Sequence, residues 1–91
     1  MELAFECDPR KRALLLKERE FDLLDTAEVF EDPQRMDFPD VRHEYGEQRR
    51  VAIGMALSRL FTVVYTGRGP VIWLITAWPS SRKERDRYAA H

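Results

Sequence analysis

The sequence predicts a small α+β fold, and two patterns support this prediction. The first is a stretch that reads as three adjacent strands joined by short turns, residues 48–78. The second is a pair of helical segments before this stretch and one helical segment after it. Because an apolar sheet face must be covered, we expect these helices to pack on a twisted antiparallel sheet. We expect one domain over residues 1–91, since this length supports one modest hydrophobic core.

The three strands form the predicted meander. Residues 50–57 alternate large apolar residues with small or polar ones, a period of two that places an apolar row on one sheet face. Ser58-Arg59 is short enough for a hairpin turn into Leu60 to Thr66, which is rich in β-branched and aromatic residues. Gly67 to Pro70 then turns the chain into Val71 to Trp78. The second and third strands carry apolar residues at both odd and even positions, so we expect both sheet faces to be at least partly covered.

Capping residues and prolines predict the elements that precede the meander. Residues 2–7 can add a short edge strand. Asp8 followed by Pro9 predicts the start of a helix that runs to about Arg19. Asp22 predicts the start of a second helix, which buries Leu23, Leu24, Ala27 and Phe30 and ends at Asp32-Pro33.

Three further features complete the predicted chain. A short strand is expected around Met36, followed by a turn over residues 38–40. Residues 41–47 read as a polar loop that leads into the meander. Ser81 with Glu84 three residues later forms a capping box, which predicts a last helix over residues 82–90.

Composition limits the classes of function. The single cysteine, Cys7, excludes an internal disulfide and a multi-cysteine zinc site and fits a reducing compartment. No run of apolar residues is long enough to span a membrane, so we expect a soluble, cytoplasmic protein without a membrane role. Residues 1–47 carry seven Lys/Arg and fourteen Asp/Glu, whereas residues 48–91 carry eight and two. This split suggests one surface for a polyanion and another for a basic partner, unless the two halves neutralise each other in the fold.

Two clusters of residues are candidates for a functional site. In the last helix, arginine side chains can hold phosphate oxygens and a tyrosine ring can stack on a base, which suits single-stranded nucleic acid. This set comprises Arg82, Lys83, Arg85, Arg87 and Tyr88, and an ordinary solvated basic helix is the alternative. In the loop, His43 lies near Glu44, Glu47 and Arg49 and can exchange protons near neutral pH, although a loop with surface ion pairs has the same pattern. The turn at Gly67-Arg68-Gly69-Pro70 presents Arg68, and no metal-ligand spacing recurs, so we expect neither a metal nor a cofactor.

Seven short motifs in this order resemble the BrnT family of toxins over nearly the whole chain. They are FECDPRK at 5–11, AEVFEDP at 27–33, PDVRHEYGEQR at 39–49, AIG at 52–54, VVYTGRG at 63–69, LITAW at 74–78 and SRKERDRY at 81–88. The resemblance implies a fold like that of the RelE toxins, with two N-terminal helices, a twisted antiparallel sheet and a C-terminal helix. It also implies a ribonuclease toxin of a type II toxin-antitoxin pair that arrests translation.

The resemblance implies partners and site residues as well. The implied partner is a BrnA-type antitoxin of the ribbon-helix-helix class in a hetero-oligomer, with operator DNA bound only through that antitoxin and RNA as the substrate. The matched positions are Lys11 in the first helix, His43, Gly46, Glu47 and Arg49 in the loop, and Arg82, Glu84, Arg85 and Tyr88 in the last helix. On this hypothesis Arg49, Arg82 and Arg85 bind phosphate, Tyr88 stacks a base, and His43 or a nearby cation transfers a proton without a metal. Lys11, Arg68, Lys83 and Arg87 are expected to bind RNA.

Three positions depart from the family pattern. Cys7 stands where the family usually has tryptophan, and Arg19-Glu20 stand where it usually has a histidine-glycine pair. Trp78 stands where it usually has arginine, and we expect this residue to lie beside Arg82 and Arg85. Because tryptophan carries no charge, the resemblance leaves two hypotheses open: an attenuated ribonuclease, or an inactive homologue that only binds antitoxin and regulates its promoter.

Overall fold

The computed structural model describes residues 3–42 and 46–91, and within these ranges it is an α+β fold with a five-stranded mixed sheet and three helices. This confirms the predicted α+β class. The expectation of an antiparallel sheet is wrong in one respect, since residues 4–7 pair in parallel with the last strand and make the sheet mixed. The strands are β1 (Ala4–Cys7), β2 (Met36–Pro39), β3 (Arg50–Ala56), β4 (Arg59–Arg68) and β5 (Val71–Pro79). The helices are α1 (Pro9–Arg19), the 3₁₀ helix η1 (Leu23–Glu31) and α2 (Arg82–Ala90). In the part of the chain that the structure describes, no helix is long and apolar enough to cross a bilayer.

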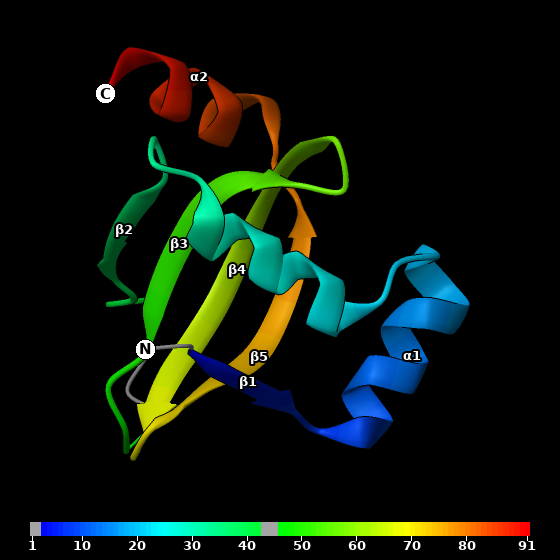
Figure 1. Ribbon diagram of the computed structural model, residues 1–91. Coiled ribbons are helices and arrows are strands. Elements are labelled where there is room, and N and C mark those ends of the chain that lie inside the picture. Colours follow the sequence, from blue (N-terminus) through cyan, green and yellow to red (C-terminus); the bar gives the residue numbers. More distant parts are fainter. Residues whose placement is uncertain (1–2, 43–45) are drawn as a thin grey trace.

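The sheet has the strand order β1-β5-β4-β3-β2 (Figure 1). β4 lies between β3 and β5 and is antiparallel to both, β2 is antiparallel to β3, and β1 is parallel to β5. The turn between β3 and β4 comes one residue earlier than predicted, because Leu57 and Ser58 are the two residues with positive φ, 51° and 66°. Two successive positive φ angles form the tight turn that matches the twist of a hairpin.

The helices begin where the capping residues predict. The Asp8 carboxylate accepts a hydrogen bond from the Arg10 backbone N–H at 2.8 Å, and Asp22 accepts one from Leu24 at 3.0 Å. Ser81 and Glu84 form a complete capping box at the start of α2. The predicted turn over residues 38–40 is wrong, because Phe38 and Pro39 pair with β3 as part of β2. Proline is tolerated there because β2 is an edge strand.

The front face of the sheet carries the main core under η1, which crosses β3, β4 and β5 in Figure 1. Leu23 and Val29 of η1 are fully buried, and both pack in one cluster with Phe61 of β4. Gly54 permits this approach, since an added Cβ would lie 2.9 Å from Cγ1 of Val29. Burial of a side chain of this size stabilises the fold by roughly 1.5–3 kcal/mol. The front face is therefore the closed, stabilising side of the sheet.

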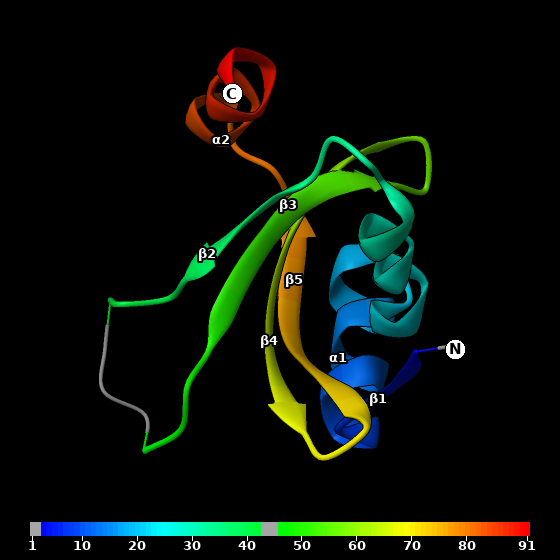
Figure 2. The same ribbon diagram turned by 60° about the vertical axis from the view of Figure 1, so that its left-hand side comes forward.

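Among the described residues, those that cover the back face lie mainly at one end. Figure 2 shows α1 and η1 on one side of the sheet, while β2 bends away on the other and α2 lies beyond the end of β5. The small back-face cluster consists of Val51, Ile53 and Val64, with Met36, Phe38, Ile75, Trp78 and Tyr88 packed against it. Met55 and Leu57, the rest of the predicted apolar row, are about 40% exposed.

A β-bulge determines which β5 side chains reach the back face. Tyr65 of β4 is opposite Leu74, but the preceding Val64 is opposite Thr76, so β5 carries one extra residue. The bulge reverses the alternation along the strand. Leu74 and Ala77 both pack in the front cluster, whereas Ile75 and Trp78 both pack in the back one.

Candidate functional site

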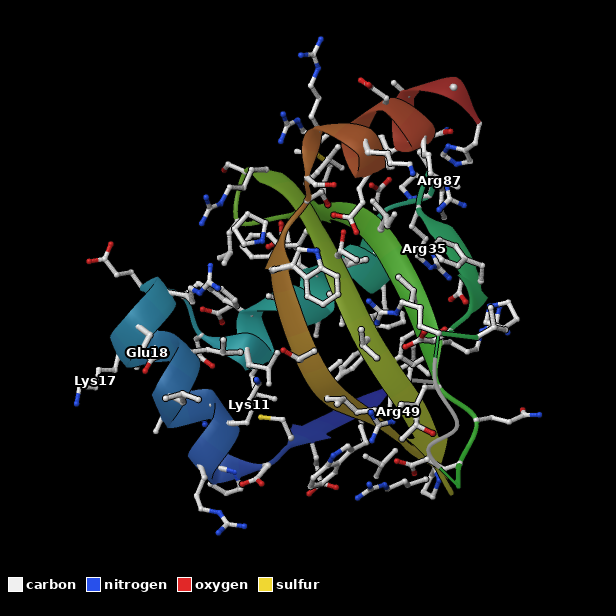
Figure 3. All side chains as sticks on the ribbon, turned by 180° about the vertical axis from the view of Figure 1, so that it is seen from behind. Lys11, Lys17, Glu18, Arg35, Arg49 and Arg87 are labelled. Atoms are coloured by element: carbon white, nitrogen blue, oxygen red, sulfur yellow. The ribbon has the colours of Figure 1, made fainter. Side chains whose placement is uncertain are left out.

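Two neighbouring grooves occupy the back face of the sheet. The first, which we name the basic groove, is lined by Asp8, Lys11, Glu47, Arg49, Arg68, Trp73, Ile75 and Thr76. The second, which we name the aromatic groove, is lined by Phe38, Pro39, Asp40, Val41, Arg42, Val51, Thr62, Trp78, Glu84 and Arg87. In Figure 3, Lys11 and Arg49 lie toward one end of this face and Arg87 lies near α2 at the other.

The centre of the basic groove is one carboxylate between two arginines. The Glu47 oxygen Oε1 lies 3.6 Å from Nε of Arg49 and 3.7 Å from Nη2 of Arg68. The guanidinium of Arg68 also lies 4.4 Å from the ring centroid of Trp73, within the range of a cation–π contact. Glu47 and Arg49 precede β3, and Arg68 ends β4, so strand pairing brings them together.

Lys11 joins this groove from the other end of the sequence. β1 pairs with β5 and Asp8 starts α1 directly after it, which places the first turn of α1 beside the basic groove. Lys11 is half-buried there, whereas Lys17 on the same helix is exposed and points away from the sheet in Figure 3. Three predicted RNA-binding cations, Lys11, Arg49 and Arg68, thus line one groove.

The aromatic groove is built from two arginine–aromatic pairs. The Arg42 guanidinium lies 5.7 Å from the Trp78 ring centroid, and the Arg87 guanidinium lies 4.7 Å from that of Phe38. Asp40 holds Arg42 through hydrogen bonds from Nε and Nη2 at 2.8 and 2.9 Å, and the Asp40 side chain is only 1% exposed. A buried carboxylate with two charge-assisted bonds fixes the orientation of the Arg42 guanidinium.

Trp78 donates a hydrogen bond to Glu84 of the last helix. Its indole N–H donates to Oε1 of Glu84 at 3.1 Å, and the backbone N–H of Ser81 donates to the same oxygen at 2.7 Å. Burial raises the pKa of Glu84, but these hydrogen bonds outweigh burial and hold that pKa below its ordinary value. Glu84 is therefore a fixed carboxylate on the wall of the aromatic groove.

Arg82 and Arg85 are not the neighbours of Trp78 that we expected. Among the described residues, the α2 side chains that line the groove around Trp78 are Glu84 and Arg87, one turn apart. Arg85 instead donates from Nη1 to the Ser80 carbonyl at 2.8 Å, back at the start of its own helix. Arg82 and Lys83 are exposed. The helix phase thus directs Arg87, but not Arg82 or Arg85, toward the sheet.

Tyr88 has structural contacts that argue against its predicted role in base stacking. Its ring packs against the back-face cluster, and its hydroxyl donates to Oδ2 of Asp32 at 2.7 Å. Backbone N–H groups of Met55 and Gln34 also donate to Asp32, at 2.9 and 2.8 Å. Burial raises the pKa of Asp32, but these three hydrogen bonds outweigh burial and lower that pKa. The hydrogen bond between the Tyr88 hydroxyl and Asp32 also raises the pKa of Tyr88. Tyr88 therefore fastens α2 to the body of the protein.

The grooves also contain residues that the sequence did not single out. Trp73 was expected only as part of the third strand of the meander, and Phe38 was expected in a turn. The sequence could have predicted the place of Trp73, since the predicted turn between Arg68 and Val71 returns the chain beside Arg68 and brings the start of β5 close to it. His43, the predicted proton-transfer residue, lies outside the described residues. Within the ranges that are described, no three His, Cys, Asp or Glu side chains are grouped so as to hold a metal ion.

Comparison with known proteins identifies the family. No curated protein matches the chain. The family model of the ribonuclease toxin BrnT of type II toxin-antitoxin systems matches residues 7–84, which include the whole of both grooves except Arg87. The chain therefore belongs to the BrnT family of type II toxin-antitoxin ribonuclease toxins.

Proposed function

We propose that this protein cleaves RNA in the basic groove and arrests translation as the toxin of its pair. The observation that carries the proposal is the convergence of Lys11, Arg49 and Arg68 around Glu47 on the open back face. Arginine and lysine side chains bind phosphate through charge-assisted hydrogen bonds, and clustered cations bind a polyanion. The adjoining Trp73 ring offers a stacking surface beside these cations.

In the proposed reaction the 2′-oxygen of one ribose attacks the adjacent phosphorus. The P–O5′ bond breaks, which leaves a 2′,3′-cyclic phosphate on one fragment and a 5′-hydroxyl on the other. We assign His43, on sequence grounds, to take the proton from the 2′-hydroxyl, since its ordinary pKa is near neutral. The leaving 5′-oxygen takes a proton from water and so becomes the 5′-hydroxyl. Arg49 and Arg68 stabilise the extra negative charge on the phosphate, Lys11 binds a neighbouring phosphate, and no metal takes part.

The positive residues of α2 extend this surface in our proposal. Arg87 borders the aromatic groove, and Arg82, Lys83 and Arg85 lie nearer the start of the helix. We propose that they bind the RNA backbone outside the reacting phosphate rather than the phosphate itself. Tyr88 supports α2 through its bond to Asp32 and does not stack a base.

Trp78 attenuates the activity in this proposal. An arginine at residue 78 would add a positive charge to the back face, where the phosphates bind, whereas tryptophan adds none. We therefore propose slow cleavage by this chain. The alternative, an inactive homologue that binds antitoxin and regulates its promoter, predicts no cleavage even with arginine at residue 78.

We further propose that a BrnA-type antitoxin of the ribbon-helix-helix class neutralises the toxin in a hetero-oligomer and binds operator DNA for both. In this proposal the fold is of the RelE type, with α1 and η1 as the two N-terminal helices and β3 to β5 as the meander. The exposed apolar residues Leu14 and Leu16 of α1 give such a partner a surface to bury.

The test of RNA cleavage compares two lysines of one helix. Lys11→Ala removes a cation from the basic groove, and Lys17→Ala removes the same charge from the opposite side of α1. We expect Lys11→Ala to slow cleavage of total RNA by about tenfold or more, since one lost phosphate contact costs roughly 1.5–3 kcal/mol. Lys17→Ala should cleave like the wild type. Equal rates for both variants would show that the basic groove is not the site.

A further inference from the structure

We propose that the aromatic groove is a nucleobase subsite, which selects a base with an exocyclic amino group. This inference rests on the proposed function, because the base belongs to an RNA strand whose backbone occupies the basic groove. It adds a site that recognises the base, whereas the basic groove recognises only the phosphate backbone.

The walls of the groove are suited to a flat aromatic ring. Trp78 and Phe38 each lie beneath an arginine, Arg42 at 5.7 Å and Arg87 at 4.7 Å from the ring centroids. A base can stack on an aromatic ring or on the plane of a guanidinium, so either layer of these pairs can receive it. The two arginines also favour the negative phosphate attached to that base. The groove volume of about 370 Å³ lies within the range of small-molecule sites.

Glu84 supplies the selectivity. Its Oε1 already accepts hydrogen bonds from Trp78 and Ser81, Oε2 takes part in neither of them, and the hydroxyl groups of Ser81 and Thr62 also favour the ionised carboxylate. An ionised carboxylate accepts hydrogen bonds and donates none. It therefore favours a base that presents an amino group, as adenine, cytosine and guanine do. Uracil has no amino group, and its one donor on that edge, N3–H, lies between two carbonyl oxygens that would face the carboxylate unfavourably.

The two grooves lie along one strand. Trp73 lines the basic groove and Trp78 lines the aromatic groove, both on the back-face side of β5. Five residues of a β-strand span about 16 Å, a distance that a few nucleotides of extended RNA cover. The bulge in β5 brings both tryptophans onto the same face of the sheet, so a single RNA molecule can contact both.

The test observes both tryptophans at once. The indole N–H signals are assigned in nitrogen-15-labelled protein with the variants Trp73→Phe and Trp78→Phe. Short 2′-O-methyl oligonucleotides of adenosine, cytidine or uridine are then titrated, because the methyl group blocks cleavage. An abasic ribose-phosphate oligomer serves as the backbone control.

We expect every oligomer to shift the Trp73 signal, and only the adenosine and cytidine oligomers to shift the Trp78 signal strongly. The uridine oligomer should bind about tenfold more weakly than the adenosine oligomer, in line with the loss of one hydrogen bond to a charged group. Glu84→Gln should reduce this preference to less than about threefold, because the amide can also donate to uracil. Its matched control is Asp86→Asn, the same charge change at an exposed position of α2, which should keep the full preference.

Two outcomes would overturn the proposed base subsite. If the abasic and uridine oligomers shift the Trp78 signal as much as the others, the aromatic groove does not select a base, and the proposed function stands. If no oligomer shifts either signal, RNA does not bind this face, and the proposed function fails together with the subsite.

Discussion

Glu47 lies between the two arginines of the basic groove, which strand pairing brings together, and its contacts with them are loose. Its distances to Arg49 and Arg68, 3.6 and 3.7 Å, are longer than hydrogen bonds, and the side chains are partly exposed. Ion pairs of this kind contribute at most about 1 kcal/mol. In the proposed reaction, a phosphate takes the place of the carboxylate between two guanidinium groups that already lie close together.

The side chain at position 78 determines whether the back face carries one more positive charge. Trp78→Arg would place a guanidinium beside Glu84, which would partly neutralise it, and near Arg42 and Arg87. We expect cleavage to become about tenfold faster, less than the 10² to 10³ typical of a dedicated charge-stabilising donor, because Glu84 competes for the new group. The measurement is the cleavage rate of one RNA by wild type and variant at equal concentration. An arginine variant that folds equally well but gains no rate would remove residue 78 from the account of activity.

Tyr88 is expected to matter for stability rather than for cleavage. Tyr88→Phe removes the hydrogen bond to Asp32 and should lower the free energy of unfolding by about 1–2 kcal/mol at pH 7. Since the pKa of Asp32 is lowered in the fold, its contribution is present above about pH 5 and is lost as the pH falls below about 4. The difference between wild type and variant should therefore shrink at acid pH. Urea unfolding at several pH values measures it, and an unchanged stability with lost cleavage would return Tyr88 to the active site.

At the scale of elements, α1 carries a site residue but is weakly held. Leu15 is the one buried side chain among its eleven residues, and Leu14 and Leu16 are 45% and 54% exposed. Arg12 joins the helix to the start of η1 through two hydrogen bonds to Asp22, both 2.8 Å long. Among the described residues, the position of Lys11 in the basic groove thus depends on the burial of Leu15, on the Arg12–Asp22 ion pair and on β1.

Asp22→Asn tests that dependence, because asparagine keeps the cap of η1 and removes the charge that binds Arg12. We expect faster amide hydrogen exchange in α1, with η1 unchanged, and slower RNA cleavage. Its control is Glu28→Gln, the same loss of charge at an exposed position of η1, which should alter neither. If α1 exchanges at the wild-type rate in Asp22→Asn, the ion pair does not hold the helix.

The elements also show what a sequence can predict. The starts of α1, η1 and α2 were predictable because caps and prolines act within a few residues. The parallel pairing of β1 with β5 and the bulge opposite Val64 were not, since they depend on contacts between distant segments. Strict alternation would put Trp73 and Trp78 on opposite faces, and the bulge puts both on the back face. The same limit explains why Arg49 and Arg68 were named separately while their meeting at Glu47 was not foreseen.

At the scale of the whole molecule, the charge split along the sequence does not become two separate surfaces. The basic groove takes Lys11 and Glu47 from the acidic half of the chain and Arg49 and Arg68 from the basic half. The fold covers the front face with η1 and leaves the back face largely open, with α2 at one end. An RNA strand can therefore reach both grooves without unfolding any element, and an antitoxin that covers the same face would block it.

The most direct measurement of the central claim is cleavage of total RNA by purified protein in the presence of a chelator, with analysis of the new ends. Wild type should produce fragments with 2′,3′-cyclic phosphate and 5′-hydroxyl ends, at a rate that EDTA does not change. Arg49→Ala should be slower by about 10² to 10³, because it loses a donor that stabilises charge in the transition state. Fragments that appear at the same rate with Arg49→Ala, or no fragments from wild type at any concentration, would contradict the claim that the basic groove cleaves RNA.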